Sequence, residues 1–436
     1  MAETNGISHG ERTTKKMHFV IVGGSLGGLA TGIALKTLGH NTTILERNPT
    51  PLLHDQGAGI VAGGPALEFL RRYNRCKRQD IAVPSDRRQY LNKNGDIIHS
   101  VDASHNMSSW DLTYHLMRAN YDGLTSPYCD VPPDDPTHGT TTHQHNSTVT
   151  SVAQTPSGVQ VTYYTTTDPN LTFTINADVL IAADGPSSAI RSLFLPSLKR
   201  TYTGYCALRG TVPESNISSS TLSLLTNRFT FFHAPGIQIL TYLIPGPHGT
   251  LTPGERLVNF VYYTNFPADS PEFREIMTDK DGKHHRLTLP PGMVSPSAWE
   301  KQKQIAKEKL PPQFAEVVCA ATRPFVQAVT DVISPTNEFL DGKVVLIGDA
   351  LAGFRPHTVA STSQAAYDAM VYADYVAGEI TREEWKVKTM GYARYLKTSP
   401  VSVLCGFTQE GLYVTNEVMA NMAELPEVGQ SDTFVD

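Results

Sequence analysis

The sequence predicts an α/β protein in which a Rossmann-like layer of parallel strands and helices is interrupted by a mostly β segment and followed by C-terminal helices. Three observations predict this fold. A glycine-rich turn at 23–28 joins a short apolar strand to a helix-like run. Two continuously apolar runs, at 177–183 and 343–347, are typical of strands covered on both faces. Between about 200 and 335, strand-like runs alternate with loops rich in proline and glycine.

The N-terminal elements form a βαβ unit. Met17 to Val22 (MHFVIV) is the first strand, and the glycine turn follows it. Leu29 to Leu38 is rich in alanine and leucine and predicts a helix, which Gly39 ends. Thr42 to Glu46 (TTILE) is the second strand. Strand, turn, helix and strand within about thirty residues are the βαβ pattern.

Later segments are assigned by the same patterns. The stretch 124–147 is rich in proline, threonine, histidine and aspartate and predicts a long surface loop. Its three histidines (His138, His143 and His145) lack the cysteine or carboxylate spacing of a metal site, so we interpret them as part of a solvated loop. Gly158 to Tyr164 alternates like a half-buried strand, and 361–396 has a helical pattern.

The length suggests two domains or one large composite domain. Because the dinucleotide-binding pattern is interrupted, we expect a leader (1–16), a cofactor-binding domain in three parts (17–85, 111–199 and 336–400), substrate-domain strands (86–110 and 200–335), and a C-terminal helical segment and tail (401–436).

Composition excludes several classes of protein. The formal charge is −6, so no electrostatic footprint for nucleic acid is present. Five scattered cysteines without a CxxC pair argue against a disulfide framework and a zinc site, and favour a reduced, cytoplasmic protein. No run is long and apolar enough to span a membrane. A basic cluster is interpreted as a solvated face over about two helical turns, with an anion- or partner-binding patch as the alternative: Arg71, Arg72, Arg75, Lys77 and Arg78.

The glycine turn predicts a nucleotide site. In GGSLGG, Gly23 and Gly28 match a G-x-G-x-x-G fingerprint, whereas Ser25 replaces the middle glycine that lets the backbone approach a pyrophosphate. Glu46 ends the second strand about twenty residues later, where an acid can bind the two ribose hydroxyls. Because an acid disfavours a 2′-phosphate, the site suits NAD or FAD rather than NADP.

Two further turns extend this site. Asp184 and Gly185 follow one buried strand, and Asp349 and Ala350 follow another. In α/β sheets, ligands bind at the carboxyl ends of the strands. Three such turns along one chain therefore favour a single long cofactor lying across the sheet.

These residues resemble the single-component FAD-dependent aromatic hydroxylases, the group of para-hydroxybenzoate hydroxylase, over residues 17 to about 400. The branch containing 2,6-dihydroxypyridine 3-monooxygenase is the most similar, on strings such as TGYCALRGTVPE, TYLIPGPHGTLTPGERLVNFVYYTN and RPHTVASTSQAAYDA. The resemblance implies that FAD is the cofactor and NAD(P)H a co-substrate. Oxygen would be held as a flavin hydroperoxide and passed to an electron-rich ring.

The resemblance also implies roles for individual residues. Glu46 would bind the adenosine ribose, and Arg47 completes the acid-Arg pair that ends the second strand at the cofactor site. Gly59 would line the flavin side, Arg118 would contact the pyrophosphate or ribityl region, and Asp349 a ribityl hydroxyl. Asp184 and Gly185 belong to a motif used for both FAD and NAD(P)H. The segment after Pro356, with Ser361 and Thr362, would wrap the flavin ring. Val359 and Ser361 replace the G-x-G found in most of the group, which could alter how freely the ring moves.

Candidate catalytic residues lie in the β segment and the flavin loop. Arg209 is a cation that could stabilise a phenolate, or alternatively a strand-end arginine paired with an acid such as Glu214. Tyr242 and Tyr205 could donate or relay a proton, or be core tyrosines. His357 titrates in the right range, or anchors backbone.

The expected function is therefore an FAD-dependent monooxygenase that uses NAD(P)H and O2 to hydroxylate or epoxidise an aromatic or heteroaromatic small molecule. The alternatives are a flavin dehydrogenase or oxidase without oxygen insertion, and an inactive flavin-binding scaffold. A homodimer is a family-level expectation. The sequence does not distinguish NADH from NADPH, because Glu46 belongs to the FAD site.

Overall fold

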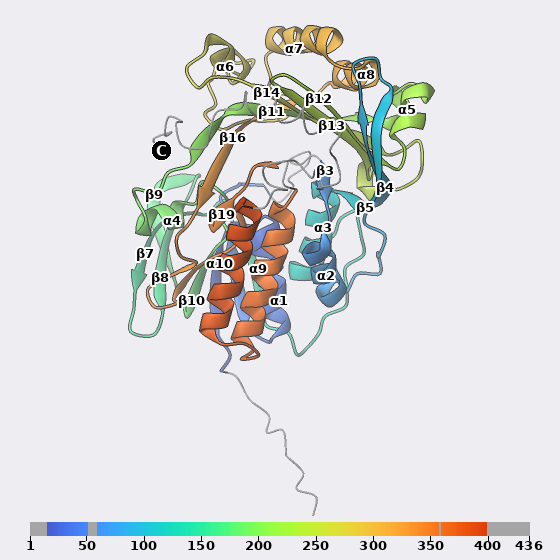
Figure 1. The fold of residues 1–436 in the computed structure, drawn as a ribbon. Helices are drawn as coiled ribbons and strands as arrows, with labels where there is room; N and C mark the ends of the chain where they lie inside the picture. Colours follow the sequence, from blue (N-terminus) through green and yellow to red (C-terminus); the bar gives the residue numbers. More distant parts are fainter. Residues whose placement is uncertain (1–14, 51–58, 357–358, 399–436) are drawn as a thin grey trace, which may run out of the picture.

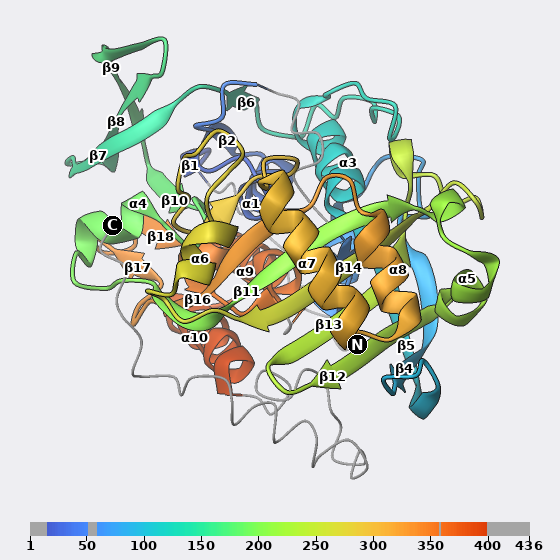
Figure 2. The same ribbon diagram turned by 90° about the horizontal axis from the view of Figure 1, so that it is seen from above.

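The computed structural model describes residues 15–50, 59–356 and 359–398. Two large sheets lie one above the other, with the site-bearing loops between them (Figure 1). Helices α1, α9 and α10 cover the lower sheet, and α6, α7 and α8 lie on the outer face of the upper sheet (Figures 1 and 2). Within the described residues, no helix is both long enough and apolar enough to cross a membrane.

The lower sheet has six strands in the order β17-β18-β10-β1-β2-β6. Its members are β1 (His18–Val22), β2 (Asn41–Leu45), β6 (Thr141–Gln144), β10 (Val179–Ala182), β17 (Glu338–Phe339) and β18 (Val344–Leu346). All neighbouring pairs are parallel except β17 with β18. The predicted βαβ unit and the two covered strands are confirmed. The turns after β1, β10 and β18 therefore meet at one edge of the sheet.

Strand β6 corrects the expectation of a surface loop over 124–147. Residues 141–144 pair in parallel with β2 as the outermost strand of the lower sheet. The sequence TTHQ lacks the apolar run of an inner strand, because an edge strand is covered less completely. The strand brings His143 beside the glycine turn.

Helices surround this sheet. They are α1 (Leu26–Thr37), α2 (Gly64–Tyr73), α3 (Trp110–Asp122), α4 (Ala189–Phe194), α9 (Ser361–Val376) and α10 (Arg382–Thr398). Helix α1 begins three residues earlier than predicted, and Gly39, with φ of +87°, lies just beyond its end. The helical pattern expected over 361–396 is confirmed. The apolar sides of α1, α3 and α9 form one core with β1 and β10.

The upper sheet contains β3 (Gly59–Val61), β4 (Val83–Leu91), β5 (Ile97–Ser109), β11 (Thr201–Pro213), β12 (Arg228–Ala234), β13 (Ile237–Ile244), β14 (Leu257–Asn265), β15 (Thr288–Leu289), β16 (Phe325–Ile333) and β19 (Ala352–Gly353). Its outer face packs under α5 (Ser219–Leu225), α6 (Pro271–Ile276), α7 (Pro296–Lys309) and α8 (Pro312–Ala320). The sequence predicts mainly strands between 200 and 335, and these helices were not predicted. Strand β19 pairs with β16 and so ties the segment after Asp349 to the upper sheet.

A third, three-stranded sheet stands beside the lower sheet (Figure 2). It consists of β7 (Thr148–Gln154), β8 (Val159–Thr165) and β9 (Asp168–Ala177). The alternating strand expected at 158–164 is confirmed as β8, in which Val159, Val161 and Tyr163 are buried and the residues between them are less so.

The basic cluster near residue 75 does not lie on two helical turns. Helix α2 ends at Tyr73, so only Arg71 and Arg72 are helical, and both bind Glu68. Arg78 is partly buried, and its guanidinium donates to the carbonyl groups of Tyr128, at 2.8 Å, and Gly249. Arg78 therefore joins loops rather than forming part of a solvated face. The C-terminal segment 401–436 and most of the predicted leader lie outside the described residues.

Candidate active site

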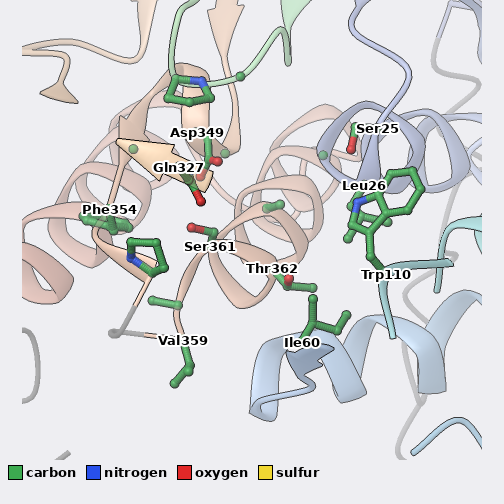
Figure 3. A pocket seen from close by; sticks show the side chains of 18 of the residues that line it. Ser25, Leu26, Ile60, Trp110, Gln327, Asp349, Phe354, Val359, Ser361 and Thr362 are labelled. Carbon is green, nitrogen blue, oxygen red and sulfur yellow. The ribbon is translucent and has the colours of Figure 1, made fainter. Parts of the chain in front are cut away.

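A cavity of about 330 Å³ opens between the two large sheets, within the size range of ligand sites (Figure 3). Its floor comes from the turns after β1, β10 and β18 and from the start of α9, and its roof comes from β3, β11, β13, β14 and β16. The lining includes the predicted site residues Ser25, Gly59, Gly185, Arg209, Tyr242, Asp349, Pro356, Ser361 and Thr362. The cavity thus combines cofactor-type turns with side chains of the β segment.

The glycine turn presents the N-terminus of α1 to this cavity. Gly23 has φ of +103°, and a Cβ on Gly28 would lie 1.9 Å from the Gly23 carbonyl oxygen, so both positions require glycine. Ser25 is the N-cap residue of α1, and its side chain makes no capping hydrogen bond. Ser25 and the first helical residues line the cavity. Because the first N–H groups of a helix have no partner within the helix, this end suits a phosphate group.

Glu46 lies behind the turn. Its Oε2 accepts a hydrogen bond from the Gly24 N–H at 2.6 Å, and its Oε1 accepts one from the Asn48 N–H at 2.8 Å. The carboxylate is buried and lies outside the cavity lining, whereas the adjacent Arg47 is exposed. Glu46 therefore fixes the conformation of the glycine turn in this structure.

His143 of β6 and His145, which directly follows the strand, lie beside the same turn, not in a solvated loop. The His143 and His145 rings are 4.4 Å apart. A Cβ on Gly24 would lie 2.5 Å from His143 Nε2. Burial, reinforced by the nearby Arg118, lowers the pKa of His143 to about 3, so the ring is neutral at pH 7. Among the residues that the structure describes, no group of three or more His, Cys, Asp or Glu side chains could hold a metal ion.

Arg118 is not among the residues that line the cavity. It is 3% exposed and forms a bidentate ion pair with Asp122, with the shorter contact at 2.9 Å. Its Nη1 also donates to the Tyr114 hydroxyl at 2.6 Å. The structure therefore gives Arg118 an internal pairing role within α3 and does not place it in the cavity lining.

The turn after β10 carries Asp184 and Gly185. Asp184 Oδ2 accepts a hydrogen bond from the Ile190 N–H at 3.2 Å and so binds the first turn of α4. Burial raises the pKa of Asp184, and the hydrogen bonds at α4 oppose this shift. Gly185 has φ of +80° and lines the cavity.

The turn after β18 places Asp349 in the cavity and Ala350 behind it. Burial raises the pKa of Asp349, and a hydrogen bond from Ser361 together with the charge of Arg200 opposes the shift. Within the described residues, Asp349 Oδ1 has no hydrogen-bond partner. Ala350 is buried, and its carbonyl accepts from Arg191 at 2.8 Å. Figure 3 shows Asp349 and Ser361 on the same side of the cavity.

The candidate residues of the predicted flavin loop differ in whether they line the cavity. Pro356, Ser361 and Thr362 line the cavity, whereas His357 lies outside the described residues. Val359 also lines the cavity and has φ of +49°, a left-handed conformation that is unfavourable for a β-branched residue.

Arg209 reaches the cavity from the middle of β11. Its Nη2 is 3.4 Å from the Gly59 carbonyl oxygen, and its guanidinium lies 5.3 Å from the centre of the Phe325 ring. The alternative that Arg209 pairs with Glu214 is wrong, because Glu214 binds Arg256 at 2.6 Å. The cation therefore faces the cavity without that acid.

The two candidate tyrosines differ in position. Tyr242 lines the cavity from β13, and burial raises the pKa of its hydroxyl to about 12, opposed by Arg209. Tyr205 is absent from the lining: its ring packs edge-on to Tyr263, and the Arg355 guanidinium lies 6.0 Å from its centre. Tyr205 is therefore a core side chain in this structure.

Sequence reasoning missed several lining residues: Trp110, Arg200, Tyr263, Gln327 and Thr330. The alternation of strands could have indicated two of them. Tyr263 and Gln327 lie two residues from the inward-facing Val261 and Val329. Trp110 and Arg200 carry no such signal, since they lie just outside strands of the upper sheet.

Comparisons with known proteins agree with this geometry. A family model described as FAD binding domain-like matches residues 202–331. The curated 2,6-dihydroxypyridine 3-monooxygenase of Paenarthrobacter nicotinovorans is 27% identical over 355 residues, which cover 81% of each chain. The chain is therefore similar in sequence to an FAD-dependent aromatic-ring monooxygenase. The resemblance found in the sequence, and its branch, are thereby confirmed.

Solved structures of these hydroxylases share the fold. The 2,6-dihydroxypyridine-3-hydroxylase of Arthrobacter nicotinovorans superposes with a TM-score of 0.75 at 24% identity, covering 97% of this chain and 100% of that one. A salicylate hydroxylase substrate complex gives 0.63 at 17% identity, covering 94% and 93%. Klebsiella pneumoniae HpxO complexed with FAD and uric acid gives 0.63 at 16% identity, covering 95% and 98%.

Proposed function

We propose that this protein is an FAD-dependent monooxygenase that uses NAD(P)H and O2 to hydroxylate or epoxidise an aromatic or heteroaromatic small molecule. The supporting observation is one cavity lined both by the three cofactor-type turns and by Arg209 and Tyr242 of the upper sheet. The relationship to an aromatic-ring monooxygenase supports the same reading.

The described residues fit FAD. The N-terminus of α1 offers backbone N–H groups for the pyrophosphate, and the unpartnered Asp349 Oδ1 offers an acceptor for a sugar-alcohol hydroxyl. A Cβ on Gly59 would lie 2.6 Å from the Tyr242 ring, so any larger residue at position 59 would clash with Tyr242 at the cavity lining. When bound, FAD supplies the redox chemistry, namely hydride acceptance and oxygen activation. The chain binds and orients the reactants and excludes water.

The upper sheet would bind the ring substrate. Arg209 would stabilise negative charge on a ring oxygen, because its guanidinium lines the cavity. The Tyr242 hydroxyl is protonated at neutral pH and can donate a hydrogen bond to the same oxygen. Gln327 lies on the neighbouring strand β16 and adds a donor and an acceptor.

Further parts of the proposal concern organisation. The cofactor-binding domain would comprise 17–85, 111–199 and 336–400, and the substrate domain 86–110 and 200–335. Glu46 would bind the adenosine ribose. Arg118 would contact the cofactor only if its ion pair with Asp122 opens.

A cytoplasmic homodimer is proposed, and sedimentation of the purified protein would test the oligomeric state.

The experiment that tests the function is anaerobic reduction of the bound flavin by NADH and NADPH, with and without phenols, hydroxypyridines and indoles. We expect one ring class to accelerate reduction, and the aerobic product to contain one atom from ¹⁸O2. Reduction without oxygen incorporation would favour a dehydrogenase or oxidase. Bound flavin that neither nicotinamide reduces would favour a scaffold.

A further inference from the structure

Side chains of helix α9 form hydrogen bonds with the N–H and the carbonyl oxygen of Gly348, the residue before the cavity-facing Asp349. The Gly348 N–H donates to Asp368 Oδ2 at 2.9 Å, and Gln364 Nε2 donates to the Gly348 carbonyl oxygen at 3.3 Å. Both side chains are fully buried. Because side chains of α9 bind both the N–H and the carbonyl group of Gly348, the turn is attached to that helix.

The attachment is continuous along one face of α9. Ser361, Gln364 and Asp368 are separated by three and four residues, the spacing that places side chains on one helical face. Ser361 hydrogen-bonds the Asp349 side chain. Between these contacts, Ala365 packs against Gly348, whose φ of +60° is a left-handed conformation. The face therefore fixes the backbone of the turn and the side chain that the turn presents.

We propose that Asp368 and Gln364 are positioning residues that hold the Gly348–Asp349 turn in the conformation that binds FAD. The inference rests on the proposed function, because it assigns the turn to the cofactor. Neither side chain lines the cavity, so they act through Gly348 and not by touching the ligand.

The charge state of Asp368 should make FAD binding depend on pH. Burial raises the pKa of Asp368 to about 8, and the Asp349 carboxylate raises it further, whereas the Gly348 and Gln364 hydrogen bonds lower it. The other titratable groups near it are Tyr367 of α9 and Tyr392 of α10, and Arg200 lies beyond Asp349. Asp368 is therefore neutral at pH 7. Ionisation would place a second negative charge beneath Asp349 and near an anionic cofactor.

The test is FAD binding by the full-length protein after flavin removal, followed by quenching of flavin fluorescence from pH 6.5 to 9.5. We expect D368A to raise the FAD Kd roughly 10- to 100-fold at pH 7, because the buried Gly348 N–H loses its acceptor. D368N keeps a carbonyl oxygen at that place, so its Kd should remain within about threefold of that of the unaltered protein.

The pH series separates positioning from general stabilisation. In the unaltered protein, the FAD Kd should rise above pH 8, by up to about tenfold per pH unit, because binding favours neutral Asp368. D368N should remove this dependence. Q364M keeps the size of the side chain and removes only the donor, so it should weaken binding even if D368A fails to fold. D374N, on the solvent side of α9, is the matched control.

The outcomes are decisive. The proposal is overturned if folded D368A binds FAD like the unaltered protein, or if D368N loses as much affinity as D368A. It is also overturned if Q364M has no effect. If the unaltered protein binds no FAD at any pH, the proposed function fails as well, which distinguishes that failure from the loss of the positioning role alone.

Discussion

Arg209 is the side chain on which the substrate proposal most depends, because it brings a positive charge into the cavity from the β strands that also carry Tyr242 and Gln327. We expect R209A to retain FAD and to lose about 100-fold or more in substrate-dependent product formation, the usual effect of removing one oxyanion donor. Oxidation of NAD(P)H without product would increase. R228A, a change on β12 outside the cavity lining, should leave both rates unchanged. Undiminished product formation by R209A would contradict the assignment.

Val359 illustrates backbone strain at a single residue. Its φ of +49° costs a β-branched residue on the order of 1–2 kcal/mol, and glycine avoids this cost. We expect V359G to raise the free energy of unfolding by about 1 kcal/mol, measured by urea denaturation. The same change at Val387, exposed on helix α10, should instead lower it by about 0.5 kcal/mol. A destabilised V359G would show that the side chain contributes more by contact than it costs in strain.

At the scale of elements, one ion pair joins the flavin loop to the substrate strand β16. Arg355 binds Asp331 at 2.8 Å, in the residues next to Pro356, while Gln327 and Thr330 of β16 line the cavity. We expect D331N to increase hydrogen exchange in segment 352–356 and to raise the FAD Kd a few-fold. D341N removes a surface pairing with Arg382 instead, and should change neither quantity. Unaltered exchange in D331N would show that the β16–β19 pairing holds the loop by itself.

The sequence predicted elements well where periodicity alone decides them. Strands β1, β10 and β18 are covered on both faces and therefore read as continuous apolar runs. Strand β6 was missed because an edge strand with the sequence TTHQ carries no such run. Helix α7 was missed because most of its surface is polar, and its position is set by Trp299 and Ala306 packing on the upper sheet.

At the scale of the whole molecule, the sequence could predict only those site residues that lie in turns next to recognisable strands and helices. The glycine turn and Asp349 precede or follow recognisable elements, so spacing located them. Trp110, Arg200 and Gln327 come together only because the upper sheet lies over the carboxyl ends of the lower one (Figure 1). Arg118 illustrates the converse: family resemblance suggested a role, but the structure pairs it with Asp122.

Because the cavity is lined by both large sheets, FAD should stabilise the two layers together. A ligand present at 100 times its Kd adds about 2.7 kcal/mol to the free energy of unfolding. For a chain of this length, with roughly 2.1 cal/mol/K of unfolding entropy per residue, that corresponds to a rise in Tm of about 3 °C.

We expect calorimetry of the flavin-free protein to show this shift in a single transition when FAD is added. D349A should fold and lose the shift, because it removes a cavity-facing acceptor without touching the Gly348 contacts to α9. D341N serves as a surface control and should keep it. Two transitions, of which FAD moves only the lower, would show that the cofactor binds one layer alone. In that case the cavity between the sheets would not be the cofactor site as a whole.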